Sequence, residues 1–168
     1  MTKLRLPILL TVLLFTIAAA SAEDSLLDKP KARSLTTEEK PMFGPKSGGL
    51  HYDPRMIRAA EIARQRAHPR MTWHCWAYVK DALLAANVVQ TRPTSGWARE
   101  AGEELCTKYG FKKISTMNPM KAPIGAVIVY GGQDAGHVEL RTENGFVSDF
   151  ISAQPYPRPV IGIYVKPA

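Results

Sequence analysis

Cys75, His137 and Asp149 are the residues whose types and order in this chain could perform nucleophilic chemistry. Cys75 begins an amphipathic run with helical spacing, and the other two follow on segments that alternate like paired strands. A thiol reacts as its thiolate, and the unpaired N–H groups of a helix's first turn stabilise that negative charge. The base comes from elsewhere in the chain, because nucleophile and imidazole meet in space rather than in sequence. The order therefore suits a cysteine nucleophile, its base and a carboxylate that orients the base, and it predicts an enzyme.

The two cysteines also allow a different interpretation. A Cys75–Cys106 disulfide would brace a secreted binding or inhibitor module without catalysis, and such a bridge is common in an oxidising compartment. We favour a free Cys75, with Cys106 as a small buried hydrophobic residue in a later helix. A metal site of Cys75, His74 and His137 is disfavoured, because the chain has no HExxH or CxxC pair. We therefore expect neither a metal nor another cofactor.

The N-terminus has the three parts of a secretory signal. Lys3 and Arg5 precede an uncharged stretch over 6–20, and Ala20-Ser21-Ala22 forms a small-x-small cleavage site. We predict cleavage after Ala22 and a secreted or periplasmic location. The apolar run is shorter than the roughly 20 residues that cross a bilayer, so stable membrane insertion is not expected.

Length and charge then limit the partners. Removal of the signal over 1–22 from 168 residues leaves 146, which suits one domain, and we expect a monomer. The signal carries two of the 22 basic residues, so 20 remain against 15 acidic ones, a net charge of about +5. This charge favours anionic partners. Nucleic acid is not among them, because no basic stripe interleaved with aromatic residues is present.

The order of the predicted elements gives an α+β fold. Residues 23–50 are rich in Lys, Pro, Ser and Thr and are expected to form a flexible lead-in to a domain over 51–168. Asp53-Pro54 begins the first helix, and Thr72 is the expected N-cap of the second, which leaves Lys80 outside. A third helix is expected over 97–109. Extended segments follow and form an antiparallel sheet, with strands expected over 112–115, 126–130, 137–142, 146–151 and 160–165.

The hairpin around Asn144-Gly145 fixes which side chains share a face. A two-residue turn there would place Asp149 opposite Leu140, among core residues. A three-residue loop with Gly145 in the left-handed conformation instead shifts the pairing by one residue. Phe146 and Phe150 then join Val138 and Leu140 on one face, while His137, Glu139, Val147 and Asp149 share the other. We predict this second register, which puts Asp149 diagonally beside His137.

Four short motifs in the same order resemble one enzyme family. They are Cys75-Trp76-Ala77-Tyr78-Val79, the segment 122–128 entering a strand, Gly136-His137-Val138, and Val147-Ser148-Asp149-Phe150. Together they are similar to the cysteine, histidine-dependent amidohydrolase/peptidase (CHAP) family and its NlpC-type relatives. The resemblance covers about 52–165. It implies a papain-like fold, with N-terminal helices packed on an antiparallel sheet, and an enzyme that cuts amide bonds of bacterial peptidoglycan.

The resemblance also implies the roles of single residues. It assigns Cys75 as nucleophile, His137 as base and Asp149 as third member, and the backbone N–H of Cys75 as an oxyanion donor. His74 stands where the family often has glutamine or aspartate, and we regard it as a weak second donor. Glu139 is an alternative orienter. Two residues along a strand span about 6.5 Å, which disfavours a direct bond to the imidazole, so a solvated or substrate-facing Glu139 is expected.

Transglutaminases share the order of cysteine, histidine and aspartate and the papain-like core. An acyl transferase of that type is therefore the alternative enzyme class. Two free thiols in the oxidised native protein favour either enzyme, whereas a protein without free thiols favours the disulfide-braced module.

Overall fold

The computed structural model describes residues 46–47 and 50–168. The predicted signal over 1–22 lies outside these residues, as does most of the predicted lead-in. A two-stranded antiparallel sheet, β1 (Lys46–Ser47) with β2 (Leu50–His51), occupies the end of the lead-in. Strand pairing therefore begins before residue 51, where the domain was expected to start.

Three α-helices form within the segments where the sequence predicts them, but the second begins at Cys75 with His74, not the expected Thr72, at its N-cap position, and the third α-helix begins at Ala101 instead of Trp97. They are α1 (Arg55–Arg66), α2 (Cys75–Ala85) and α3 (Ala101–Tyr109), and a 3-10 turn, η1 (Ala98–Glu100), leads into α3. Asp53 caps α1, because its carboxylate accepts a hydrogen bond from the backbone N–H of Arg55 at 2.9 Å. Gly110 ends α3 in the left-handed conformation, with φ of 73°. Local capping chemistry thus sets helix boundaries near those expected.

The strands form one six-stranded antiparallel sheet in the order β3-β8-β4-β5-β6-β7. Its central strands, β4 and β5, pair directly, so Tyr130 lies opposite His137. Helices followed by an antiparallel sheet confirm the α+β class. The bounds are β3 (Lys112–Lys113), β4 (Val127–Tyr130), β5 (His137–Thr142), β6 (Gly145–Val147), β7 (Ile151–Ser152) and β8 (Val160–Val165), with a second 3-10 turn, η2 (Pro119–Lys121), before β4.

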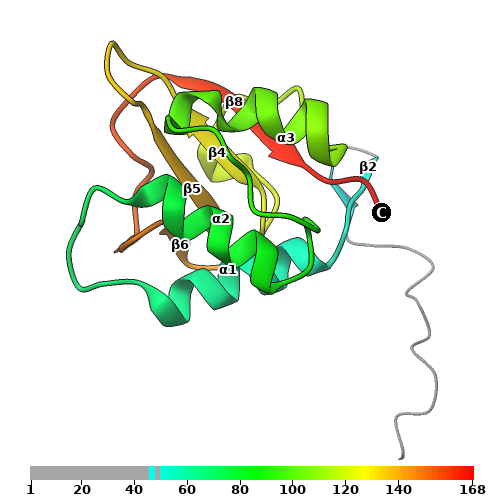
Figure 1. Cartoon of the computed structure of the whole chain (residues 1–168), viewed down its shortest axis with the longest axis horizontal. Coiled ribbons are helices and arrows are strands. Elements are labelled where there is room, and N and C mark those ends of the chain that lie inside the picture. The colour runs from blue at the N-terminus through cyan, green and yellow to red at the C-terminus, as the bar shows by residue number, and fades with distance from the viewer. Residues whose placement is uncertain (1–45, 48–49) are drawn as a thin grey trace, which may run out of the picture. The chain divides into compact units, whose positions relative to one another are not determined.

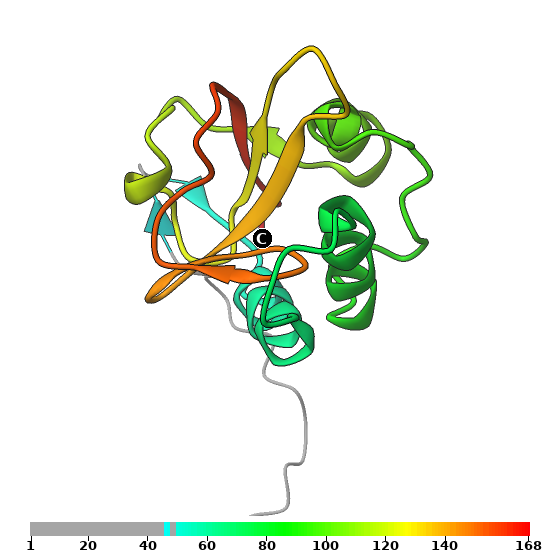
Figure 2. The ribbon, with the colours of Figure 1, turned by 90° about the vertical axis from the view of Figure 1, so that its left-hand side faces the viewer.

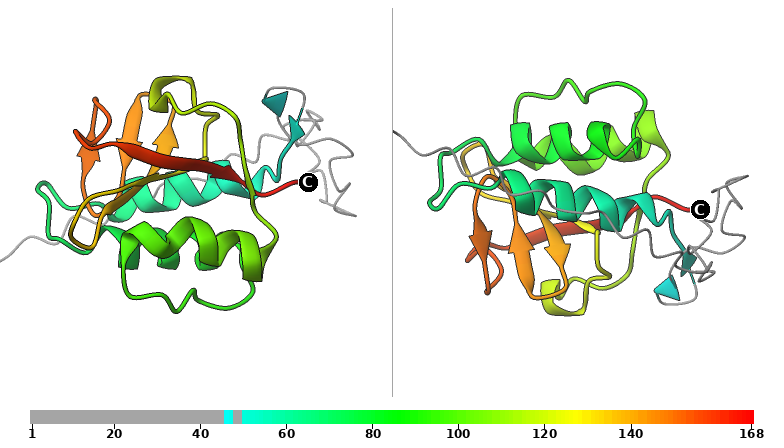
Figure 3. Two further views of the ribbon diagram at one scale, coloured as in Figure 1. Left: turned by 90° about the horizontal axis from the view of Figure 1, so that it is seen from above. Right: turned by 90° about the horizontal axis from the view of Figure 1, so that it is seen from below.

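The helices and the sheet form two layers. Figure 1 shows α1 and α2 next to each other, with α3 near β8. Seen at right angles, and from above and below, the three helices lie together on one side of the strands (Figures 2 and 3). Helix α2 packs against β5, and α3 packs against β4 and β8. The start of α2 is therefore held over the strand that begins with His137.

The hairpin between β5 and β6 has a different register from the predicted one. Thr142 pairs with Gly145 and Leu140 pairs with Val147, so the loop has two residues, 143 and 144, instead of three. Phe146 lies opposite Arg141 and shares its face, while Val147 joins the face of Leu140. Burial could not select the register, because both Phe146 and Val147 are buried and the central strands are covered on both faces.

The strand predicted over 146–151 is also interrupted. It ends at Val147, and β7 folds back on β6, with Val147 paired to Ile151. The backbone N–H of Ser148 donates to the carbonyl of Phe150 at 2.9 Å, which closes a tight turn around Asp149. Asp149 is therefore a turn residue, and no strand alternation places its side chain beside His137.

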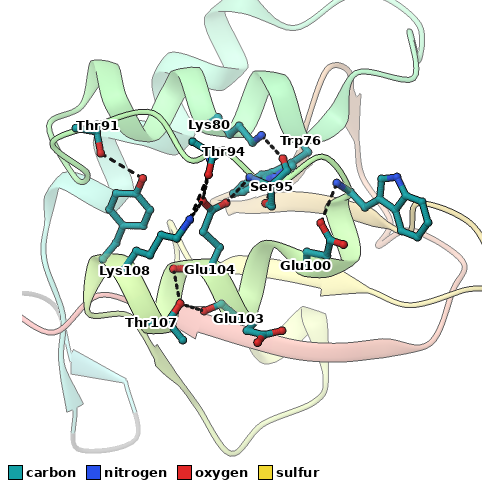
Figure 4. A network of polar contacts seen from close by, with 12 residues as sticks. Trp76, Lys80, Thr91, Thr94, Ser95, Glu100, Glu103, Glu104, Thr107 and Lys108 are labelled. Atoms are coloured by element: carbon teal, nitrogen blue, oxygen red, sulfur yellow. Dashed lines mark hydrogen bonds and ion pairs between the residues drawn. The ribbon is translucent and has the colours of Figure 1, made fainter.

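A buried polar network joins α2, α3 and the loop between them (Figure 4). The carboxylate of Glu104 accepts from the backbone N–H groups of Thr94 and Ser95 at 2.7 and 2.9 Å, and Lys108 contacts it at 3.1 Å. These donors lower the pKa of Glu104 against the opposing effect of burial. Lys80, expected to be exposed, is 6% exposed and donates to the carbonyl of Ser95. The network fixes the loop after α2, which the sequence showed only as rich in turn residues.

Candidate active site

Cys75 is the first residue of α2, preceded by His74 at the N-cap position. Both Cys75 and Cys106 are half-buried free thiols. The disulfide on which the non-enzyme interpretation depended is therefore not formed. The first N–H groups of a helix have no intrahelical acceptor. In the first turn of α2 they can therefore stabilise a negative charge on the sulfur of Cys75 or on the oxygen of a bound carbonyl group.

His137 begins β5 and reaches Cys75 across the interface between the helix and the sheet. Gly136 has φ of 75°, and a Cβ there would lie 2.6 Å from the carbonyl oxygen of Tyr130, so glycine permits the close turn into the strand. The imidazole is buried, at 4% exposure. Burial lowers the pKa of His137, but the interactions with Cys75 and with the carboxylate of Glu139 outweigh that effect and raise the pKa to about 9. The pair thus favours a protonated imidazole beside the sulfur.

Glu139, rather than Asp149, is the carboxylate that faces the imidazole. Its Oε2 lies 3.5 Å from Nε2 of His137, an ion-pair distance that is longer than a hydrogen bond, and no hydrogen-bond acceptor meets that nitrogen. The expectation of a solvated Glu139 is wrong, because the residue is 1% exposed. Its side chain spans the separation along the strand, since both residues lie on the same face of β5.

Two further donors hold Glu139. The hydroxyl of Tyr130, a fully buried residue of β4, donates to Oε1, and the backbone N–H of Tyr156 donates to the same oxygen at 3.4 Å. Burial and the neighbouring carboxylate raise the pKa of Tyr130 far above its ordinary value, so this phenol is a neutral donor. Tyr130, Glu139, His137 and Cys75 therefore form a continuous chain of polar contacts. Tyr130 could not be recognised as part of this chain from the sequence, because it ends an apolar run typical of a core strand.

Asp149 has a different set of partners. Its Oδ2 accepts from the backbone N–H of Thr72 at 2.6 Å, from the Thr72 hydroxyl at 2.8 Å and from the backbone N–H of His74 at 3.2 Å. The Ser148 hydroxyl donates to Oδ1 at 3.0 Å. Burial opposes ionisation, but these donors lower the pKa of Asp149. Its prediction as the partner of His137 is corrected: its carboxylate contacts the loop that leads into Cys75.

The segment over 72–74 is shaped by those contacts. His74 has an exposed side chain, while its backbone N–H is bonded to Asp149. Trp73 has φ of 64°, in the left-handed region, and is 80% exposed. Neither feature could be recognised from residue types, because the left-handed conformation is rare for a tryptophan.

Tyr156 covers one side of the imidazole. Its ring stacks on His137 with centroids 3.9 Å apart and an angle of 21° between planes. The loop that carries it is tied to the turn before β5, because Arg158 forms a two-pronged ion pair with Asp134, with Nη2 and Oδ2 2.9 Å apart. A proline-rich loop that the sequence did not connect with catalysis thus forms a wall of the site.

Other kinds of site receive no support from the described residues. Within residues 46–47 and 50–168, no group of three or more His, Cys, Asp or Glu side chains could hold a metal ion. No helix of that part of the chain is long and apolar enough to cross a membrane. A surface hollow of about 300 Å³ is lined by Gly131, Gly132, Gln133, Asp134, Arg158 and Pro159. Neither Cys75 nor His137 lines it, so the location of the candidate site rests on the contacts of those two side chains.

Comparison with known proteins shows a likeness in fold. The chain matches no family model, and no curated protein matches it in sequence. Among solved structures, it is similar to a chain in the crystal structure of the type VI native effector-immunity complex Tae3-Tai3 from Ralstonia pickettii. The TM-score is 0.55, with 23% sequence identity, and the match covers 66% of this chain and 98% of the other. At that identity the likeness establishes a shared fold.

Proposed function

We propose that the protein is a cysteine amide hydrolase that cleaves peptidoglycan stem peptides through an acyl-thioester intermediate. The observation that carries the proposal is the pairing of Cys75, at the start of α2, with His137, at the start of β5, whose pKa the thiol helps to raise. The similarity of fold to a chain of an effector-immunity complex is compatible with it. A nucleophile and a base held in contact by two rigid elements are the minimum requirement for acyl transfer.

The first half of the reaction forms the thioester. The imidazolium of His137 stabilises the Cys75 thiolate, which attacks the amide carbonyl and forms a carbon–sulfur bond. The backbone N–H of Cys75 stabilises the developing oxyanion, with the exposed side chain of His74 as a weaker second donor. The carbon–nitrogen bond then breaks, and His137 gives its proton to the leaving amine.

The second half regenerates the enzyme. Neutral His137 takes a proton from water, and the resulting hydroxide attacks the thioester carbonyl. The carbon–sulfur bond breaks, the carboxylic acid leaves, and the thiolate–imidazolium pair is restored. Because Nε2 of His137 faces Glu139, Nδ1 is the nitrogen that exchanges the proton with Cys75 in this mechanism. Glu139 orients the ring and stabilises the imidazolium, and Tyr130 keeps the carboxylate in place.

The substrate assignment combines location with charge. The predicted signal over 1–22 would deliver the enzyme outside the cytoplasm, where peptidoglycan stem peptides offer amides bordered by carboxylates. A mature chain with about five excess positive charges would attract such substrates. The residue-level resemblance to CHAP and NlpC-type enzymes supports the same reaction.

The test uses the purified mature protein in reductant with isolated peptidoglycan. We expect soluble muropeptides with newly exposed amino groups, and iodoacetamide should block their release. Cys75→Ala should abolish release with an unchanged melting temperature, because it removes the nucleophile without disturbing the core, whereas Cys106→Ala should retain most activity.

Other product patterns would contradict the proposal. New reducing ends without new amines would indicate a glycosidase mechanism, which a thiol–imidazole pair does not explain. Ammonia release with cross-linking of amines to glutamine would move the assignment to a transglutaminase. Equal activity of Cys75→Ala and the wild type would remove Cys75 as the nucleophile.

A further inference from the structure

Trp73 combines two unfavourable features, two residues before Cys75. Its φ of 64° lies in the left-handed region, which a bulky side chain occupies at a cost of about 1–3 kcal/mol. Its indole is 80% exposed, the largest exposed fraction among the large hydrophobic residues of the described chain. Strained residues of this kind concentrate at sites that bind ligands.

The strain is imposed by Asp149 and not by the indole. The backbone N–H groups on both sides of Trp73, those of Thr72 and His74, donate to the same carboxylate oxygen of Asp149, at 2.6 and 3.2 Å. Two bonds converging on one buried acceptor force the residue between them to turn outward. A glycine would adopt this conformation without steric cost. The fold therefore requires the turn at position 73 but gives no reason for a tryptophan there.

We propose that the indole of Trp73 is a binding platform for a sugar ring of the peptidoglycan glycan strand, next to the scissile amide. The inference rests on the proposed function and extends it by naming the part of the substrate that this residue contacts. Because Asp149 holds the residues on either side of it, the platform has a fixed position relative to Cys75. Such preorganisation reduces the entropy lost on binding.

The chemistry of the substrate favours the sugar over the peptide as the partner of the indole. Stem peptides consist mainly of alanine, γ-linked glutamate and a diamino acid, which present small methyl groups and charges. A pyranose ring instead presents a flat face of C–H groups whose dimensions match an indole. Trp73 offers this broad apolar surface with its polar N–H at one edge. The enzyme would thus hold the glycan with Trp73 while Cys75 acts on the attached peptide.

The experiment measures binding to the Cys75→Ala protein, so that it does not depend on turnover. Three ligands are compared by calorimetry: the N-acetylglucosamine–N-acetylmuramic acid disaccharide, the free stem peptide and the disaccharide–peptide. Adding Trp73→Gly should weaken binding of the disaccharide and of the disaccharide–peptide at least tenfold, with binding of the free peptide unchanged. Trp73→Tyr should retain most of the affinity, because it keeps an aromatic face.

Stability provides the second measurement. Trp73→Gly removes the strain at φ of 64°, so its melting temperature should be equal to or above that of the parent protein. Asn87→Gly is the matched control, because Asn87 is the other non-glycine residue with positive φ in the described chain, at 57°. It should leave all three affinities unchanged.

Three results would overturn the platform. They are an unchanged disaccharide affinity in Trp73→Gly, an equal loss for the free peptide, and a Cys75→Ala protein that does not bind the disaccharide at all. Failure of the proposed function would look different, since the wild type would then release no amines from peptidoglycan whatever the affinities are.

Discussion

Asp149 and Glu139 are buried carboxylates on either side of the Cys75–His137 pair, but they have opposite kinds of partner. Asp149 accepts two backbone N–H groups and two hydroxyls, all from the loop before α2 and from its own neighbour. Glu139 accepts one phenol and one backbone N–H and faces the imidazole. Backbone donors cannot change protonation, whereas an imidazole can. We infer that Asp149 fixes where the nucleophile stands and that Glu139 determines the charge of the base.

Glu104 has the same kind of partners as Asp149. It too is a buried carboxylate that accepts backbone N–H groups from a loop, in this case those of Thr94 and Ser95 (Figure 4). Both carboxylates have a lowered pKa because of these donors. The molecule therefore uses two acids to hold loops against α2, one before the helix and one beside Trp76 and Lys80, while Glu139 faces the imidazole.

The largest effect is expected from Glu139→Gln. The variant retains an acceptor for Tyr130 but removes the negative charge beside His137, so the pKa of the imidazole should fall below about 9. The thiolate–imidazolium pair would be less populated at neutral pH. We expect kcat/KM to fall by about 100-fold to 10,000-fold. The rate of alkylation of Cys75 by iodoacetamide between pH 5 and 9, read at that residue by mass spectrometry, measures the loss of thiolate directly.

The wild-type pH dependence gives the reference for this variant. His137 must be protonated to release the amine, so activity should decline as pH rises through about 9. Because this folded-state value lies above the ordinary 6.5, the contribution of the imidazolium to stability is complete below about pH 6.5 and is lost through about pH 9. Glu104→Gln is the control and should leave the alkaline limit of activity unchanged. An unchanged alkaline limit in Glu139→Gln would remove Glu139 from its proposed role.

Asp149→Asn should affect stability more than chemistry. A neutral amide oxygen replaces a charged acceptor for the three donors on Oδ2, so we expect a loss of about 2–3 kcal/mol in the free energy of unfolding. The alkaline limit of activity should remain at about pH 9, because Asp149 does not contact His137. Urea unfolding and the pH profile of kcat/KM separate the two effects.

Acid pH tests the same carboxylate. The pKa of Asp149 is lowered from 3.8, so its contribution to stability is present above about pH 4 and is lost as the pH falls through the folded-state value. Asp149→Asn should therefore reduce the dependence of stability on pH in acid. A large shift of the alkaline limit in this variant would restore Asp149 as the partner of the base.

The elements that carry the site were predictable because their local signals agree. Strand β5 begins at His137, as expected, and α2 begins at Cys75, a few residues after the expected N-cap Thr72. The expected α+β order follows from the same signals. Cys75 and His137 could therefore be named from the sequence together with the elements that bring them into proximity.

The third acid could not be selected, for two physical reasons. The first is that β6 ends at Val147, and buried residues on both faces leave alternation without information about register. The second is side-chain reach. The separation of about 6.5 Å along β5 applies to backbones, whereas the carboxylate of Glu139 bends to within 3.5 Å of the ring of His137. The backbone separation along a strand therefore overstates the distance between the polar ends of two long side chains on the same face.

Tyr130→Phe should produce the smallest of these effects and the most specific one. Removal of the hydroxyl takes one donor from a carboxylate that is 1% exposed, so Glu139 is held less firmly against the imidazolium. We expect the maximum of kcat/KM to fall about tenfold. Stability should decrease by about 1–2 kcal/mol, because a buried hydrogen bond to a charged group is lost.

Tyr52→Phe is the matched control, because Tyr52 is also buried and its hydroxyl donates to the carbonyl of Ile124 at 3.1 Å, away from the catalytic pair. It should lower stability by a comparable amount and leave kcat/KM unchanged. In the Glu139→Gln background, Tyr130→Phe should cause little further loss of kcat/KM, since the charge through which it acts is already absent. Additive losses in the double variant would mean that Tyr130 acts on the site by a route other than Glu139, and the chain of contacts from Tyr130 to Cys75 would then have no catalytic meaning.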